Sequence, residues 1–171
     1  SFPDIFVPRA FQPGDDPRFK AILLIPKTDP QIALIEAAIL AAAKEAWKDK
    51  ADSILKSIRG NPNKFCFQDG DMKSYDGYSG MMALSAGSKS RPLIMDSRKN
   101  LLTQADGKPY AGCYVNAMIE IFTYSTSGNG VSASLMGIKF VRDGDSFGGG
   151  RAASMDDFDE IEEGADAEDL T

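Results

Sequence analysis

Two long runs of alternating apolar and polar residues lie close together near the end of the chain, at 112–124 and 130–141, with a glycine- and serine-rich turn between them. Alternation over this length is typical of β-strands with one buried face, because successive side chains of a strand point to opposite sides. The two runs therefore predict a long β-hairpin. In the second run the alternation shifts by one residue at Gly137, which predicts a β-bulge there.

The alternation also predicts which side chains of the hairpin are exposed. In the first strand the odd positions from Cys113 to Ile121 are all apolar and should face the core. The even positions then place Tyr114, Phe122 and Tyr124 on the outside. Exposed aromatic side chains on a sheet are unusual unless a ligand stacks on them.

The remainder of the chain shows further short strands and a helical segment. Apolar runs bounded by prolines or turns predict strands at 19–26, 64–68, 81–86 and 92–96. Asp29 and Pro30 begin a helix whose apolar residues recur every three or four positions as far as Ile58. A straight helix over 30–59 would be about 45 Å long, so we expect a bend or a second start near Asp52-Ser53. The pattern predicts a mainly β fold: a small five-stranded β-barrel with one long, bent helix on its side.

The charge is unevenly divided along the chain. Residues 155–171 hold nine acidic residues and no basic one, which leaves 16 acidic against 19 basic residues, a charge of +3, in residues 1–154. We therefore expect a folded domain over 1–147, followed by a glycine joint and a disordered acidic tail over 148–171. The tail is interpreted either as a solubilising segment, or as one that competes with nucleic acid for a basic groove and binds partner proteins through Phe158 and Ile161.

Several kinds of chemistry lack the residues they need. The chain has no histidine and no CxxC pair, which excludes serine–histidine and cysteine–histidine catalysis and leaves a zinc site without ligands. Cys66 and Cys113 are expected to be free thiols in a reducing compartment. Asp69-Gly70-Asp71 and Asp143-Gly144-Asp145 are interpreted as turns rather than metal sites. We therefore expect no enzyme activity, no cofactor and no metal.

Nothing in the sequence indicates a membrane protein. No apolar run approaches the ~20 residues that span a bilayer, and the N-terminus lacks the basic-then-apolar pattern of a signal peptide. Lysines on the amphipathic helix are interleaved with acidic residues, which disfavours binding to a membrane surface. The expected location is the cytoplasm.

Basic and aromatic side chains occur side by side at several places in the β-rich part. Sequence-independent binding of single strands needs this combination, because cations hold phosphates while aromatic faces stack on any base. The predicted DNA-binding residues are Lys64, Lys73, Tyr75, Tyr78, Lys89, Arg91, Arg98, Lys99, Lys108, Tyr110, Tyr114, Phe122, Tyr124, Lys139 and Arg142. An RNA-binding or nucleic-acid-chaperone module would have a similar surface. A protein-interaction domain whose tail mimics DNA is a third interpretation.

Three segments carry a resemblance to a known family. They are FKAILLIPKTDPQ at 19–31, GKPYAGCYVNAMIEI at 107–121, and GIKFVRDGDSFGGG at 137–150 followed by the acidic end. Together they resemble the bacteriophage single-stranded-DNA-binding proteins, a family similar in plan to the T7-type protein. The family pattern maps onto Gly107, Lys108, Tyr110, Gly112, Tyr114, Asn116, Gly144, Phe147 and 148–150.

The resemblance implies an oligonucleotide-binding (OB) fold and a role in phage DNA replication, recombination or repair in the cytoplasm of the infected host. It also implies a tail that contacts replication or recombination proteins, and it leaves the formation of homo-oligomers open. The sequence departs from the T7-type pattern at its end, because T7-type tails end in phenylalanine whereas this chain ends Asp169-Leu170-Thr171.

Overall fold

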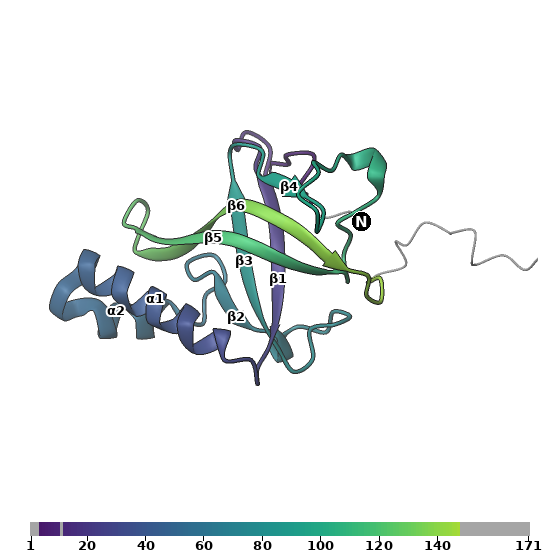
Figure 1. Ribbon diagram of the computed structural model, residues 1–171. Helices are drawn as coiled ribbons and strands as arrows, with labels where there is room; N and C mark the ends of the chain where they lie inside the picture. The colour runs from purple at the N-terminus through teal and green to yellow at the C-terminus, as the bar shows by residue number, and fades with distance from the viewer. Residues whose placement is uncertain (1–3, 11, 148–171) are drawn as a thin grey trace, which may run out of the picture.

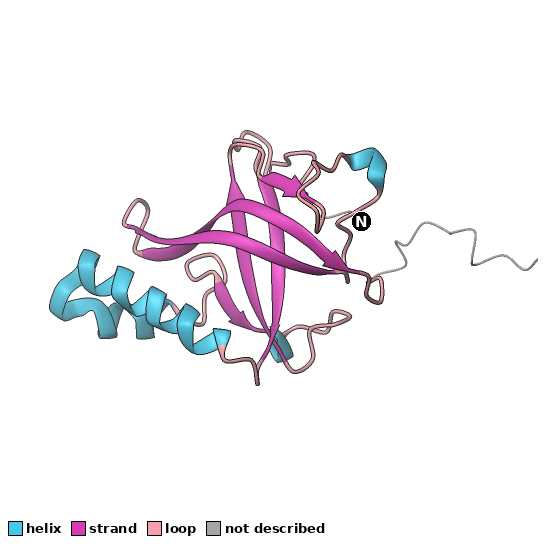
Figure 2. Ribbon diagram, viewed as in Figure 1, coloured by secondary structure: helices cyan, strands magenta, loops and turns pink. Residues whose placement is uncertain are grey.

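A computed structural model describes residues 4–10 and 12–147 (Figures 1 and 2). Within these ranges the strands are β1 (Phe19–Pro26), β2 (Phe67–Asp69), β3 (Met81–Ser88), β4 (Leu93–Met95), β5 (Tyr114–Tyr124) and β6 (Gly130–Arg142). The helices are α1 (Gln31–Trp47) and α2 (Ala51–Ile58), with 3-10 turns η1 (Lys48–Lys50), η2 (Gly70–Met72) and η3 (Gln104–Asp106). The predictions for the segment 148–171, including its disorder and the roles of Phe158 and Ile161, lie outside the described residues.

The described strands belong to one sheet in which β6 has the most partners. Strand β1 pairs with β3 in antiparallel orientation over its whole length, and β2 pairs with the first half of β3. Strand β6 pairs antiparallel with β5, parallel with β4 and, at one residue pair, parallel with β3. The mainly β, OB-like fold is confirmed. It has six strands in a sheet that is not closed, rather than five in a closed barrel, because β2 and β4 are three-residue strands that cover only part of their neighbours.

The inward side chains of β6 lie in the hydrophobic core. They are Val131, Ala133, Leu135, Ile138 and Phe140, all of which are buried. This inward row changes from odd to even positions because Met136 has no partner in the ladder: Met118 pairs with Gly137, and Ile119 pairs with Leu135. The predicted bulge is therefore confirmed, and its extra residue lies immediately before Gly137. The thiols of Cys66 and Cys113 are free, as predicted.

Helices α1 and α2 form an arm at one end of the sheet (Figure 1). The carboxylate of Asp29 accepts a hydrogen bond from the backbone N–H of Gln31 (2.8 Å), which confirms the predicted helix start. The helical segment extends over 28 residues and breaks at Lys48, whose φ of 53° interrupts it a few residues before the predicted position. Beyond the break α2 folds back beside α1, where Arg59 Nη1 lies 3.0 Å from Glu36 Oε1. None of the described helices has the length and apolar character to span a bilayer.

A lysine just after β1 holds the loop between β2 and β3. Lys27 Nζ lies 2.7 Å from Asp69 Oδ1 and 2.6 Å from Asp71 Oδ2. Asp69 Oδ1 also accepts the N–H of Asp71 (2.9 Å), which confirms the predicted turn, and Asp71 Oδ1 accepts the N–H of Gly80 (2.8 Å). The hydrogen bonds from Lys27 lower the pKa of both carboxyl groups, and the same bonds raise the pKa of the lysine. The loop 70–80 is thus tied at both ends to the edge of the sheet.

Replacing Lys27 with methionine should lower the free energy of unfolding near neutral pH. The folded-state pKa values of Asp69 and Asp71 lie below the ordinary 3.8, so their contribution is present above that pH and is lost as the pH falls through the lowered values. The lysine's contribution is present below its ordinary pKa of 10.5 and is lost as the pH rises through the raised value. Urea unfolding should therefore separate wild type from Lys27→Met at about pH 7, and the two should converge at about pH 2.

The matched control is Lys44→Met, which removes an exposed lysine from α1 and should change little at either pH. If the loss in Lys27→Met persisted unchanged at about pH 2, the lysine would act through packing of its alkyl chain rather than through its charge.

Candidate nucleic-acid interface

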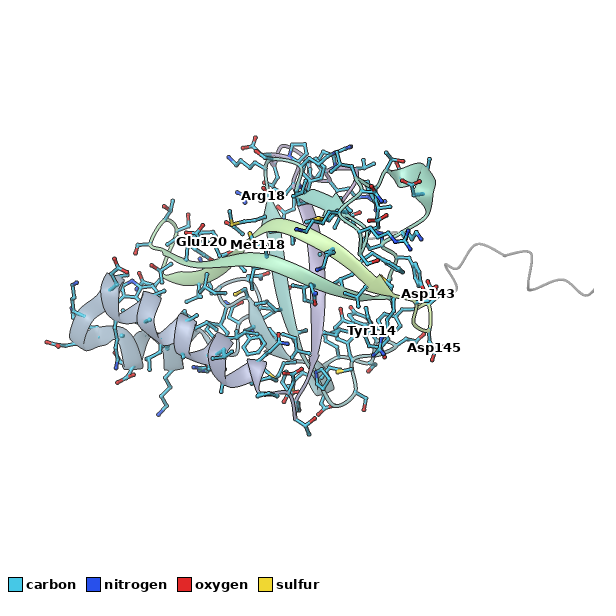
Figure 3. The ribbon with its side chains drawn as sticks, in the orientation of Figure 1. Arg18, Tyr114, Met118, Glu120, Asp143 and Asp145 are labelled. Carbon is cyan, nitrogen blue, oxygen red and sulfur yellow. The ribbon has the colours of Figure 1, made fainter. Side chains whose placement is uncertain are left out.

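Strands β4, β6 and β5 carry side chains on the side of the sheet opposite the core, and we call this surface the outer face. Its rows, read across the strands, are Leu93–Gly137–Met118 and Met95–Lys139–Asn116, with Tyr114–Arg142, Glu120–Ser134 and Phe122–Ser132 on β5 and β6 alone. Figure 3 shows Tyr114, Met118 and Glu120 spread along the hairpin, with Asp143 and Asp145 beside the Tyr114 end. The outer face therefore combines aromatic, basic and methionine side chains with one carboxylate.

An aromatic ring and a guanidinium group are paired at one end of the outer face. Tyr114 is 53% exposed and Phe122 is 37% exposed, so the predicted outward orientation of both is confirmed. The Cζ atom of Arg142 lies 4.2 Å from the centroid of the Tyr114 ring, which is a close cation–π contact. Gly144 approaches the edge of the same ring, where an added Cβ would lie 3.0 Å from Cε2. The pair is therefore held in place within the protein and keeps a positive charge beside an exposed ring.

The other end of the hairpin uses its aromatic residue differently. The Tyr124 ring covers Gly130 so closely that a Cβ there would lie 2.1 Å from Cζ, and its hydroxyl donates a hydrogen bond to the carbonyl of Asn63 (3.2 Å). Burial raises the pKa of this tyrosine. Lys64 Nζ donates to the carbonyl of Ser127 and lies 5.9 Å from the ring centroid. Tyr124 and Lys64 therefore hold the turn of the hairpin in place.

Tyr110 connects the segment after β6 to the segment before β5. Its hydroxyl donates to Asp143 Oδ1 (2.7 Å) and accepts the N–H of Gly144 (3.1 Å). Burial, together with the hydrogen bond to Asp143, raises the pKa of this tyrosine. Gly112, at φ 109°, has no room for a Cβ because the carbonyl oxygen of Asp145 would lie 1.9 Å from it. The predicted turn at Asp143-Gly144-Asp145 thus packs directly on residues 110–112.

The same segment brings a second aromatic pair to this end. The N–H of Phe147 donates to the carbonyl of Ala111 (3.0 Å), and its ring lies over Gly77 in the loop 70–80. That loop carries Tyr75, which is 63% exposed, and Tyr78, whose rings meet edge to face at 5.4 Å. Phe147 therefore links the Tyr75–Tyr78 pair to the segment that also holds Tyr110.

The remaining predicted residues are distributed elsewhere. Lys89 forms an ion pair with Asp16 (3.1 Å), and Arg91 donates to the carbonyl of Phe6 (2.9 Å), so both are engaged by the N-terminal segment. Lys108 lies over the ring of Phe140 at 5.1 Å. Lys73, Arg98 and Lys99 are exposed in loops. The structure thus brings Tyr114, Phe122, Lys139 and Arg142 onto one face, and the DNA-binding role of every residue in the predicted set stays a prediction.

Sequence reasoning assigned no role to three exposed apolar side chains on the outer face. Leu93, Met118 and Met136 are 51%, 65% and 50% exposed and surround Gly137. The available signal was weak: Met118 stands at an outward position of the alternating strand, whereas Leu93 and Met136 depend on the pairing of β4 and on the position of the bulge.

An OB-like sheet whose exposed face carries aromatic and basic side chains belongs to the class of oligonucleotide-binding folds. Comparison with known proteins narrows the class. The profile of the family described as Enterobacter phage Enc34, ssDNA-binding protein, matches residues 1–171. Protein p50 of Acyrthosiphon pisum secondary endosymbiont phage 1 is 47% identical over 163 residues, which are 94% of this chain and 89% of p50. The chain belongs to the Enc34 family of phage single-stranded-DNA-binding proteins, and the resemblance predicted from its sequence is confirmed.

Two solved structures have a similar fold. The single-stranded-DNA-binding protein from bacteriophage Enc34 in complex with single-stranded DNA is 22% identical, with a TM-score of 0.72, and the match covers 86% of this chain and 84% of that one. Another structure of the Enc34 protein is also 22% identical, with a TM-score of 0.69, over 93% of this chain and 85% of that one. At this level of identity the likeness establishes a shared fold.

Alanine substitutions should separate the structural tyrosine of the hairpin from the exposed one. Tyr124→Ala uncovers Gly130 and leaves the Asn63 carbonyl without its partner, so it should lower the free energy of unfolding by about 1–3 kcal/mol. Tyr114→Ala removes a ring that is more than half exposed and should cost less than about 1 kcal/mol. Urea unfolding of both variants measures the difference. Equal losses would contradict the distinction drawn between the two ends of the hairpin.

Proposed function

We propose that this protein binds single-stranded DNA without sequence preference, as a stoichiometric binding protein rather than an enzyme, and that the outer face is its binding surface. The observation that carries the proposal is the arrangement of Tyr114, Phe122, Lys139 and Arg142 on one exposed face of the β5–β6 hairpin. Membership of the Enc34 family and the solved complex of the Enc34 protein with single-stranded DNA support this choice of ligand.

In this proposal the cations and the rings have separate tasks. Lys139 and Arg142 bind phosphates, while bases stack on Tyr114 and Phe122 at about 1–3 kcal/mol per base. Stacking uses a surface that every base has, so affinity does not depend on base sequence. The cation–π contact places Arg142 before the ligand arrives, which reduces the entropy lost on binding. The carboxylate of Glu120, on the same face, repels phosphates and weakens the interaction.

Other predicted residues extend the proposed DNA path beyond the outer face. Tyr75 and Tyr78, with Lys73 in the same loop, continue it past the Tyr114 end, where Phe147 links their loop to the segment before β5. We give Lys89 and Arg91 no part in this path, because their donors are engaged by Asp16 and by the carbonyl of Phe6.

The biological role that we propose is protection of single-stranded DNA during phage replication, recombination and repair in the cytoplasm of the infected host. The chain would then divide into a binding domain over 1–147 and an acidic segment over 148–171. In that segment Phe158 and Ile161 are apolar residues among carboxylates, and we propose that they contact replication or recombination proteins. Support comes from the family and from the division of charge along the chain.

Two substitutions of opposite sign test the outer face. Lys139→Gln removes a positive charge and should weaken binding to oligo-dT, whereas Glu120→Gln removes a negative charge and should strengthen it, each by up to about 1 kcal/mol. Both effects should shrink as salt rises. For wild type the logarithm of the binding constant should fall with the logarithm of salt concentration by about 0.7 per phosphate neutralised. Fluorescence titration across a salt series measures all three proteins.

Lys56→Gln on α2 is the matched control, because it removes an exposed lysine outside the outer face and should behave like wild type. If Lys139→Gln and Glu120→Gln both left the affinity unchanged, the DNA path would lie elsewhere. Oligo-rU of equal length provides the second comparison, and tighter binding to it than to oligo-dT would favour an RNA-binding function.

Deletion of residues 155–171 should strengthen binding to oligo-dT at low salt. The deleted segment carries nine acidic residues and no basic one, so it competes with phosphates for the cations of the outer face at a high effective concentration. Screening over a Debye length of about 8–10 Å should remove this advantage near physiological salt. Titration of full-length and truncated protein with one oligonucleotide measures the effect. Identical curves at low salt would restrict the segment to solubility or partner binding.

A further inference from the structure

The row Leu93–Gly137–Met118 forms a slot in the outer face. Gly137 on β6 is its floor, and the side chains of Leu93 on β4 and Met118 on β5 are its walls. A Cβ built on Gly137 would lie 3.7 Å from the Cβ of Leu93 and 4.0 Å from the Cβ of Met118. The walls are 51% and 65% exposed. The slot is therefore the space that a side chain at position 137 would fill, and it opens to solvent.

The width of the slot suits one planar ring. Neighbouring strands lie about 4.8 Å apart, so the two walls rise from strands about 10 Å apart. A flat ring that contacts a side chain on each side needs about 7–8 Å, at 3.5–4.0 Å for each contact. One aromatic ring can therefore stand between Leu93 and Met118.

The chemistry of the slot favours a ring held by contact rather than by specific hydrogen bonds. Both walls are apolar, and the floor is a backbone that lies in ladders with β4 on one side and β5 on the other. The sulfur of a methionine makes favourable contacts with aromatic rings. Such a slot accepts any base and does not distinguish among the four.

The nearest charge on the outer face identifies the kind of molecule that would bring the ring. Lys139 occupies the next row on β6, two residues from Gly137 and on the same face, at about 7 Å along the strand. A ligand that places an anionic group at Lys139 and a flat ring in the slot is a nucleotide of a nucleic-acid strand.

We propose that this slot holds one unstacked base of the bound single strand, with the phosphate of that nucleotide at Lys139. The slot is a binding site in addition to the aromatic stacking positions at Tyr114 and Phe122, and it deepens the proposed function, on which it rests. Gly137 is then required for binding because a side chain there would occupy the place of the base.

The test compares two ligands of equal length: oligo-dT, and an oligomer of abasic deoxyribose phosphates that keeps the charge and lacks the bases. Gly137→Val fills the slot, and Met118→Ala removes one wall without burying anything new. Each should reduce the affinity for oligo-dT about five- to tenfold and change the affinity for the abasic oligomer less than about twofold. Met72→Ala, which truncates an 82% exposed methionine in η2, is the matched control and should bind both ligands like wild type.

Three results would overturn the slot. One is an unchanged affinity for oligo-dT in folded Gly137→Val and in Met118→Ala. Another is an equal loss for both ligands, which would indicate general disturbance of the face. A third is sedimentation of the wild type as a dimer that Met118→Ala dissociates while its affinity for oligo-dT stays the same, which would make the apolar row an interface between copies of the chain. Failure of the wild type to bind oligo-dT at all would overturn the proposed function itself, so the two failures are distinguishable.

Discussion

Strand β6 must pair along both of its edges while its inward side chains fill the core. One edge pairs with β5 along most of its length. The other edge meets Phe65 at Val131, β3 at Ser134 and β4 from Gly137 onward. Because backbone hydrogen bonds on both edges and apolar burial on one face must be satisfied by the same thirteen residues, the positions of β3, β4 and β5 are all set relative to this strand.

The bulge before Gly137 lets one strand satisfy both demands, and it connects the core to the outer face. Without the extra residue at Met136 the odd positions would continue inward, and Lys139 would turn toward the core in place of Ile138 and Phe140. Burial of an unpaired ammonium group is costly, so the shift is needed for folding. The same shift places Gly137 and Lys139 on the exposed side, where the proposed ligand contacts them.

Close backbone approaches determine where the described chain ends. The carbonyl of Asp145 lies over Gly112, and the ring of Phe147 lies over Gly77, in positions where a Cβ would collide. These contacts hold the segment after β6 beside the Tyr114 end of the outer face and beside the loop that Lys27 fixes through Asp69 and Asp71. The acidic residues of 155–171 follow in the sequence from this point, so their attachment lies close to the cations with which we propose they interact.

The sequence by itself determined the hairpin, the outward position of Tyr114 and Phe122, the bulge at Gly137 and the helix start at Asp29, because each depends on the geometry of neighbouring residues along the backbone. Only the tertiary structure decided that the helical segment turns back at Lys48, that the sheet stays open, and that Tyr124 covers Gly130. It also decided that Lys89 and Arg91 are engaged by the N-terminal segment and that Leu93 and Met118 flank a glycine. These outcomes depend on contacts between residues far apart in the chain, and local periodicity carries no information about which distant partner a side chain meets.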